Sequence, residues 1–432
     1  MQVEHLAHRP SWDCASCGMP WPCDPAREYL AAELGRVQLA VYMWANLEEA
    51  AGDLANLLAW RGLRPVPRLD QTLTDGWGAP AGSALTLAYE PARPDESIVW
   101  VPMESITKNR QSPETLRAMI ARAYGADQVP DAESPDWVSE LGHGWFNVAY
   151  RIRLRDGRQV VLKIAPPPHI EVMTYERGAM GIELAALDLI GKHTSVPVPT
   201  VDFADRGHDL CDADYFFMPY VDAGNLGIVK DTLAPHEVDA CNEAIGAATR
   251  ELNGIRGPAF GPLAGPGDPT WRACFLRMIG DVLRDGERRA VDLGYRYDLV
   301  RDVIAAHADS LDEVTEPRFV EWDLWDSNVM VRDGRIVCVI DHERAFYGDP
   351  LIEAGFTGID LAAVGDPTAF LRGYGHAELT DTERTRRRLY TLYLVLIMII
   401  ETDYRGHTDT AQYDWARERL HEVIALFGED RR

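Results

Sequence analysis

The feature that most constrains this chain is an acid–amide–acid pattern in its last third. Asp323 lies five residues before Asn328, and Asp341 follows thirteen residues after Asn328. Between Asn328 and Asp341, two apolar stretches, 329–331 and 336–340, flank the turn sequence Arg-Asp-Gly-Arg. This pattern predicts a β-hairpin closed by a tight Asp-Gly turn. The hairpin would bring Asp341 beside Asn328.

Two carboxylates and an amide held together in this way suit phosphoryl transfer. That reaction needs one carboxylate to orient and deprotonate a hydroxyl group, and oxygen ligands to hold Mg²⁺ against the phosphates. Asp323 is the candidate base, and Asn328 and Asp341 are the candidate metal ligands. Any one of the three alone would more often be an ordinary loop or strand-end residue. Their combination around an apolar hairpin favours the catalytic interpretation.

The segment from Glu321 to Asn328, Glu-Trp-Asp-Leu-Trp-Asp-Ser-Asn, resembles the aminoglycoside phosphotransferase-like family of small-molecule kinases. That family usually has His-Gly-Asp-Leu-His-x-Gly-Asn, followed by Ile-Asp-Trp/Phe-Glu, which reads Ile-Asp-His-Glu here at 340–343. The three chemical positions are retained, but Glu321 stands where the family has the His that braces the catalytic loop. Glu321 would have to brace the loop differently.

The resemblance covers the chain from about Ser105 to Gly428. It implies an α+β, two-lobed protein-kinase-like fold with a β-rich N-lobe and a helical C-lobe. We therefore expect an N-lobe over 105–221 and a C-lobe over 222–432. A small, mostly helical module with cysteines, 1–64, and a linker rich in Pro and Gly, 65–104, would precede them.

A kinase also needs a cover for the phosphates, and the segment 142–147 is the candidate. Gly142 and Gly144 lie between two apolar stretches, and glycines permit a tight turn whose backbone amides approach phosphate oxygens. An ordinary hairpin turn is the alternative. Asn147 belongs to the same segment and is grouped with it as a nucleotide-binding residue.

Lys163 lies inside the apolar stretch 160–164, where an unpaired ammonium would be costly. We expect it to contact the α- and β-phosphates and to be held by a carboxylate on the next helix. Glu183 is the first candidate, because its distance to the Val-Pro-Val-Pro segment at 196–199 matches the family's spacing. Glu176 is the second candidate, and a solvated helix carboxylate is the alternative for either.

Two further expectations concern the surroundings of this lysine. The helical period of the segment after Gly181 places Leu184, Leu187 and Ile190 on one buried stripe. The stretch 215–221 resembles the family's linker between lobes, which implies that Met218 to Tyr220 face the adenine.

The N-terminal module contains Cys14, Cys17 and Cys23 within ten residues. A Cys-x-x-Cys knuckle suits Zn²⁺, with Cys23 as a third ligand and His8 or His5 as the fourth. A redox dithiol and plain thiols are equally compatible with one such motif. A protein partner for this module is also open.

Composition limits the partners. The formal net charge is −25, which argues against nucleic acid and against an anionic membrane surface. An acidic protein would suit a cationic acceptor, although solubility alone explains the charge. The N-terminus lacks the pattern of a secretory signal, and seven scattered cysteines suit a reducing cytoplasm.

The sequence thus predicts an ATP- and Mg²⁺-dependent kinase acting on a hydroxyl group. The acceptor is open between an aminoglycoside-like antibiotic, a metabolite, and a peptide serine or threonine. The competing hypothesis is an inactive kinase fold that serves as a nucleotide-binding or interaction module, because Glu321 departs from the family pattern.

Overall fold

The computed structural model describes residues 105–429, apart from 135, 143–145, 377 and 408, together with two short N-terminal strands. The chain divides into two units, Met1–Glu96 and Ser97–Arg432. In the first unit, β1 (Ala7–His8) pairs antiparallel with β2 (Asp13–Cys14). The side chains of the predicted zinc site, the linker and the N-terminal helices lie outside the described residues.

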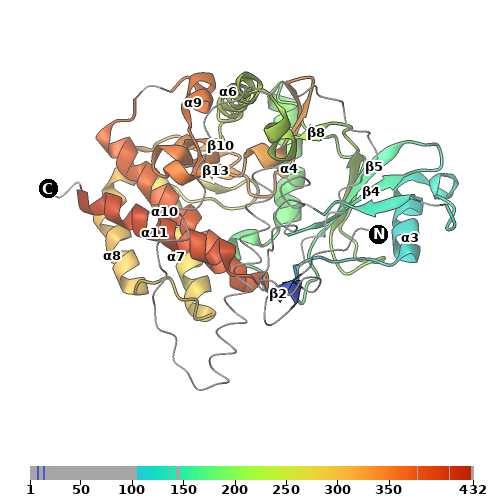
Figure 1. Cartoon of the computed structure of the whole chain (residues 1–432), viewed down its shortest axis with the longest axis horizontal. Coiled ribbons are helices and arrows are strands. Elements are labelled where there is room, and N and C mark those ends of the chain that lie inside the picture. The colour runs from blue at the N-terminus through green and yellow to red at the C-terminus, as the bar shows by residue number, and fades with distance from the viewer. Residues whose placement is uncertain are drawn as a thin grey trace, which may run out of the picture. The chain divides into compact units, whose positions relative to one another are not determined.

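A five-stranded antiparallel sheet forms the first part of the second unit (Figure 1). Its strands, in spatial order, are β3 (Val138–Glu140), β4 (Val148–Arg153), β5 (Gln159–Ile164), β7 (Tyr215–Pro219) and β6 (Phe203–Asp205). The apolar stretches 148–152 and 160–164 lie in β4 and β5, and residues 215–219 of the segment 215–221 form β7.

One face of the sheet is covered by helix α3 (Pro113–Tyr124). The Ser112 side chain accepts a hydrogen bond from the backbone N–H of Thr115, so the helix begins with a capped first turn. Side chains alternate between faces along a strand, and Leu162 and Phe217 both pack on the α3 side.

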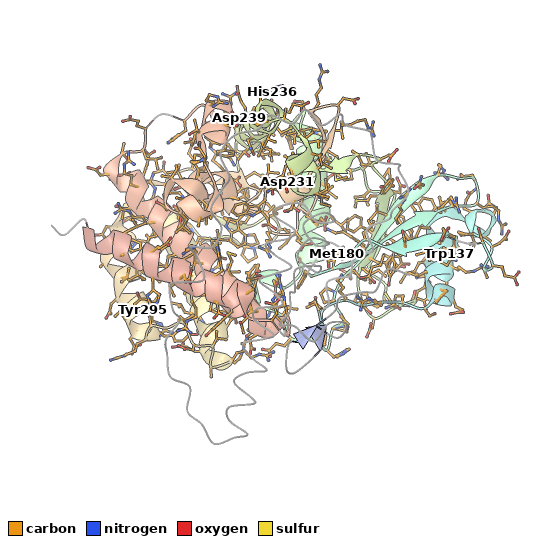
Figure 2. The ribbon with its side chains drawn as sticks, in the orientation of Figure 1. Trp137, Met180, Asp231, His236, Asp239 and Tyr295 are labelled. Carbon is orange, nitrogen blue, oxygen red and sulfur yellow. The ribbon has the colours of Figure 1, made fainter. Side chains whose placement is uncertain are left out.

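The opposite face carries helix α4 (Ala179–His193). Val161 and Phe216, the neighbours of Leu162 and Phe217 in sequence, pack there against Met180 of α4, which is labelled in Figure 2. Lys163 follows Val161 by two residues, so its side chain leaves the sheet on this same face. The alternation of β5 therefore determines where the lysine points.

The buried stripe of α4 differs from the prediction at one position. Leu187 and Ile190 are buried as expected, but Leu184 is only half-buried. The stripe instead runs through Met180 and Glu183. Ordinary apolar patterning missed this because a buried carboxylate occupies a position where hydrophobic residues are normally found.

The C-terminal part is mainly helical. It contains α6 (Pro235–Leu252), α7 (Trp271–Arg288), α8 (Tyr297–His307), α9 (Thr368–Tyr374), α10 (Asp381–Tyr404) and α11 (Ala411–Glu429). Residues 235–252, 270–283 and 299–311 show helical apolar spacing in the sequence, which predicts α6, α7 and α8. The apolar stretch 389–400 lies within α10 and is almost entirely buried. No helix among the described residues has the length and apolar character needed to cross a membrane.

The predicted hairpin is confirmed as β11 (Val329–Arg332) and β12 (Arg335–Val339). Asp333 and Gly334 both have positive φ, 50° and 68°, as the tight turn requires. β11 also pairs with β8 (Gly224–Asn225), which precedes the short helix α5 (Leu226–Val229). A second small sheet contains β9 (Gly261–Pro262), β13 (Phe346–Gly348) and β10 (Arg318–Val320).

Helices α6 and α9, near the top of Figure 1, approach each other closely through glycines. A Cβ atom on Gly246 of α6 would lie 2.1 Å from the carbonyl oxygen of Phe370 in α9. A Cβ atom on Gly373 of α9 would lie 1.7 Å from the carbonyl oxygen of Glu243 in α6. Both oxygen atoms belong to the backbone and cannot rotate away. The close packing of the two helices therefore requires glycine, which has no side chain, at these two positions.

Gly246→Ala should therefore destabilise the second unit by about 2 kcal/mol, because the methyl group forces the two backbones apart. Urea unfolding followed by circular dichroism measures this. Gly191→Ala is the matched control, since Gly191 lies in α4 and its Cβ position has no atom within 4 Å apart from its chain neighbours and the nearby backbone of its own helix. The control should be neutral or slightly stabilising. Equal effects in the two variants would show that the close approach is not limiting.

Candidate active site

A cavity of about 740 Å³ is lined by the sheet on one side and by the segments around the hairpin on the other. Seven of the predicted site residues line it together: Asn147, Lys163, Met218, Tyr220, Asp323, Asn328 and Asp341. Its volume lies in the range usual for small-molecule sites. Residues that are far apart in sequence thus share one concave site.

The buried ammonium of Lys163 is surrounded by three carboxylates. Its Nζ lies 2.8 and 2.9 Å from the two carboxylate oxygens of Glu183 and 3.5 Å from Oε2 of Glu343. It also donates a hydrogen bond to Oδ1 of Asp341. Burial would lower the pKa of Lys163, but these carboxylates hold it well above its ordinary value. The lysine therefore remains charged.

The structure distinguishes between the two candidate partners of this lysine. Glu183 binds Lys163 directly, and burial raises the pKa of Glu183 to about 7 while Lys163 opposes that rise. Glu176 is also buried, but it pairs with Arg405 at 2.9 Å. Its other oxygen accepts the backbone N–H of Met173 at 3.0 Å.

The hairpin places Asp341 next to Asn328 by backbone pairing. Val329 is opposite Val339, and the N–H of Ile340 donates to the carbonyl oxygen of Asn328 at 3.0 Å. Asp341 has a φ of 66°, a left-handed conformation that Asp tolerates better than most residues. The strand thus ends in a bend that turns the Asp341 carboxylate toward the cavity.

Asp323 and Asn328 are joined by a short hydrogen-bonded loop. The Asn328 Nδ2 donates to the backbone carbonyl of Asp323 at 2.8 Å, which leaves Oδ1 as the free face of that amide. Burial raises the pKa of the Asp323 carboxyl to about 6, against the opposing effect of Arg344. Trp325 Nε1 donates to Asp323 Oδ1 at 3.0 Å and orients the carboxylate.

Glu321 forms a buried pair with a residue that sequence analysis did not assign. Its Oε1 lies 2.9 Å from Nδ1 of His342, and the other ring nitrogen lies 3.1 Å from the carbonyl oxygen of Val339. Both side chains are at most 1% exposed. Because acceptors face both ring nitrogens, the ring is best satisfied as an imidazolium. Burial would lower the pKa of His342, but the Glu321 carboxylate outweighs it and the pKa is raised.

A buried acid, Glu353, holds the same loop by its backbone. Glu353 accepts the backbone N–H groups of Glu321 at 3.0 Å and of Trp322 at 2.8 Å. This supports Trp322 in its left-handed conformation, with a φ of 63°. Asp349 accepts from Arg386 at 3.1 Å and from Tyr390 at 2.7 Å, so its contacts are those of a structural brace.

The remaining predicted nucleotide-binding residues are partly visible. Met218 and Tyr220 line the cavity, and the Tyr220 N–H donates to the carbonyl oxygen of Gln159. Gly142 lies in the turn between β3 and β4, whereas Gly144 lies outside the described residues. Asn147 is buried and donates to Glu343 Oε2 at 2.6 Å, and its Oδ1 has no partner among the described residues.

The donor set suits a magnesium ion held together with phosphates. Among the described residues no group of three or more His, Cys, Asp or Glu side chains forms a metal site by itself. Mg²⁺ in phosphoryl-transfer sites is usually held by one or two protein oxygens plus substrate phosphates. The Asn328 amide oxygen and the Asp341 carboxylate, 34% exposed, provide such a pair.

Sequence analysis missed the residues that line the cavity from the end of α10 and the start of α11. They are Met398, Glu401, Arg405 and Gln412. No motif marks them, because they lie some sixty residues or more beyond the hairpin. It also assigned no role to Glu343, the last residue of the Ile-Asp-His-Glu motif, or to Arg344, which directly follows that motif.

Comparison with known proteins agrees with this geometry. The phosphotransferase enzyme family matches residues 137–390, more than half of the chain, and the chain therefore belongs to that family. Among solved structures, aminoglycoside phosphotransferase APH(4)-Ia in a thermostable mutant form aligns with a TM-score of 0.51 and 20% identity, over 72% of this chain and 98% of its own. The same protein has been solved with AMP-PNP and hygromycin B.

A putative fructosamine-3-kinase from Haemophilus somnus aligns equally well, with a TM-score of 0.51 and 18% identity over 72% of this chain and 97% of its own. At these identities the likeness shows the fold, which is the predicted kinase-like fold. A curated relative, a subtelomeric hrmA-associated cluster protein of Aspergillus fumigatus, is 27% identical over 139 residues, 32% of this chain. The chain spans about a quarter of the length of that relative.

The Glu321–His342 pair generates a test of pH-dependent stability. Glu321→Gln keeps the shape and removes the charge, and should lower the free energy of unfolding by about 2 kcal/mol at pH 6. The raised pKa of His342 means that the pair's contribution is complete below the unfolded pKa and is lost as pH rises through the folded pKa. Urea titrations at pH 6, 7.5 and 9 should therefore show a difference that shrinks with pH. A difference that grows with pH would exclude an imidazolium.

Proposed function

We propose that this protein is an ATP- and Mg²⁺-dependent kinase that phosphorylates a hydroxyl group of a small molecule. The observation that carries the proposal is the convergence of Lys163, Asp341, Asn328 and Asp323 in one cavity of the phosphotransferase fold. The relatives with AMP-PNP and hygromycin B support the nucleotide and the hydroxylated acceptor by likeness only.

The acceptor hydroxyl would bind at Asp323, whose carboxylate takes the proton as the oxygen attacks the γ-phosphorus. The bond from that phosphorus to the β,γ-bridging oxygen breaks, and ADP leaves. Burial keeps the Asp323 pKa near 6, so the carboxylate is ionised at neutral pH yet more basic than an exposed one.

Lys163 would orient the α- and β-phosphates, and Glu183 would keep its ammonium in place. Asn328 and Asp341 would hold Mg²⁺, which when bound neutralises the phosphate charge. In the structure Lys163 donates a hydrogen bond to Asp341. When the nucleotide binds, the ammonium of Lys163 would gain the phosphates as partners, and the carboxylate of Asp341 would gain Mg²⁺. Met218 and Tyr220 would border the adenine, and the turn containing Gly142 and Gly144 would cover the phosphates.

Glu321 in place of the family's usual His is the observation behind the alternative, a kinase fold that binds nucleotide without turnover. Its buried pair with His342 supplies a brace for the loop, which favours an active site. ATP turnover with Mg²⁺ across hydroxylated acceptors, including a Ser/Thr peptide, separates these possibilities. Nucleotide binding without transfer to any acceptor would favour the inactive module.

Asp323→Asn should reduce phosphoryl transfer by about a hundredfold or more while nucleotide binding is retained, because only the base is lost. Pre-steady-state kinetics measures the rate of transfer, and titration with nucleotide measures binding. In the unmodified protein, kcat/KM should rise with pH through about 6, as the Asp323 carboxyl ionises. Near-normal transfer in the variant would refute the assignment.

Lys163→Met and Glu183→Gln should each lower ATP-dependent activity to a similar extent. The double variant should lose little more, because the two residues act as one unit. Glu176→Gln serves as the control, since its carboxylate binds Arg405 instead. Additive losses for Lys163 and Glu183, or coupling of Lys163 to Glu176, would overturn the pairing.

A further inference from the structure

The part of the cavity next to Asp323 contains an arginine that lies against two aromatic rings. Arg344 lines the cavity, and its side chain is 16% exposed. Its guanidinium carbon lies 5.4 Å from the ring centroids of both Tyr175 and Trp322. Two aromatic faces thus hold the cation in place without using its N–H donors.

The acidic neighbours of Arg344 lie close to it but not within hydrogen-bonding distance. Its Nε is 3.6 Å from Asp323 Oδ2, and one Nη is 3.7 Å from Glu401 Oε2. Hydrogen bonds of this type are normally about 2.7–2.9 Å long. Negative charges therefore lie near the guanidinium. Within the described part of the chain, however, its N–H groups donate no hydrogen bond.

Two other carboxylates that line the cavity, those of Glu401 and Asp326, already have hydrogen-bond partners. Glu401 binds Arg405 at 2.8 Å and Gln412 at 2.7 Å. Asp326 binds Lys230 at 2.6 Å. A polycationic acceptor would compete with these partners for the two carboxylates, so the net acidity of the sequence does not by itself favour a cationic acceptor at this site.

We propose that the acceptor is a hydroxylated acid whose carboxylate or phosphate-ester oxygens bind Arg344 in the cavity. The proposal rests on the proposed kinase function and adds the class of its substrate. A planar guanidinium with free N–H groups matches an oxyanion through two parallel hydrogen bonds. Its position beside Asp323 places the acidic group of the acceptor near the hydroxyl that is phosphorylated.

The alternative role of Arg344 is to contact the transferred phosphoryl group of ATP. The two roles differ in what they change. An arginine that binds the acceptor affects acceptor KM and the preference among acceptors. Removal of an arginine that binds the transferred group lowers kcat for every acceptor alike.

The test uses probes that share one carbon skeleton and differ in charge: gluconate, gluconamide and glucamine, with the four-carbon series as a second length. Glycerol 3-phosphate against glycerol forms the phosphate arm. Transfer from ATP is followed by ³¹P NMR, and binding in the presence of Mg²⁺ and ADP by calorimetry. The anionic probes should be favoured over their neutral counterparts by about 10- to 100-fold, the usual value of a hydrogen-bonded charge.

Arg344→Gln should abolish this preference mainly through acceptor KM, and Arg344→Lys should retain part of it. Arg335→Gln, an exposed arginine at the start of β12, is the control and should keep the full preference. Equal binding of all probes, preference for glucamine, or a uniform loss of kcat in Arg344→Gln would overturn the proposal.

The outcomes separate this proposal from the kinase function. Transfer that favours the neutral or cationic probes would leave the kinase function intact and refute only the acidic acceptor. Arg344-dependent binding of anionic probes without any transfer would support the acidic ligand and count against the kinase function.

Discussion

The whole site depends on the buried ammonium of Lys163. Its contacts reach helix α4 through Glu183 and the end of the β11–β12 hairpin through Asp341 and Glu343. Without a cation at this point, three carboxylates would share a poorly solvated space and repel one another. The lysine thus holds the sheet, the helix and the hairpin segment in one arrangement, and removing it would leave uncompensated buried charge.

The fold was predictable where the local signals were strong. The Asp-Gly turn between apolar stretches predicted the hairpin, and a lysine within an apolar strand predicted a buried acidic partner. Both arguments concern a few neighbouring residues. The apolar periodicity also located α6, α7 and α8, because each buries one face against a common core.

The rest of the site required knowledge of tertiary contacts. Glu183 lies on the buried stripe of α4, and hydrophobic patterning assigned that place to Leu184 instead. Glu401 and Arg405 reach the cavity from the end of a helix whose sequence looks purely structural. Their distance along the chain gives no sign of the approach, since the packing of α10 determines it.

The exchange at Glu321 and His342 shows how a motif can be altered without being lost. The two residues are twenty-one positions apart, yet they form one buried unit. A comparison that scores each position independently counts two departures from the family pattern here and would rate the loop as damaged. Considered as a pair, the positions exchange one loop brace for another. A change at either position alone would leave the other side chain buried without its partner, so we expect the two positions to vary together.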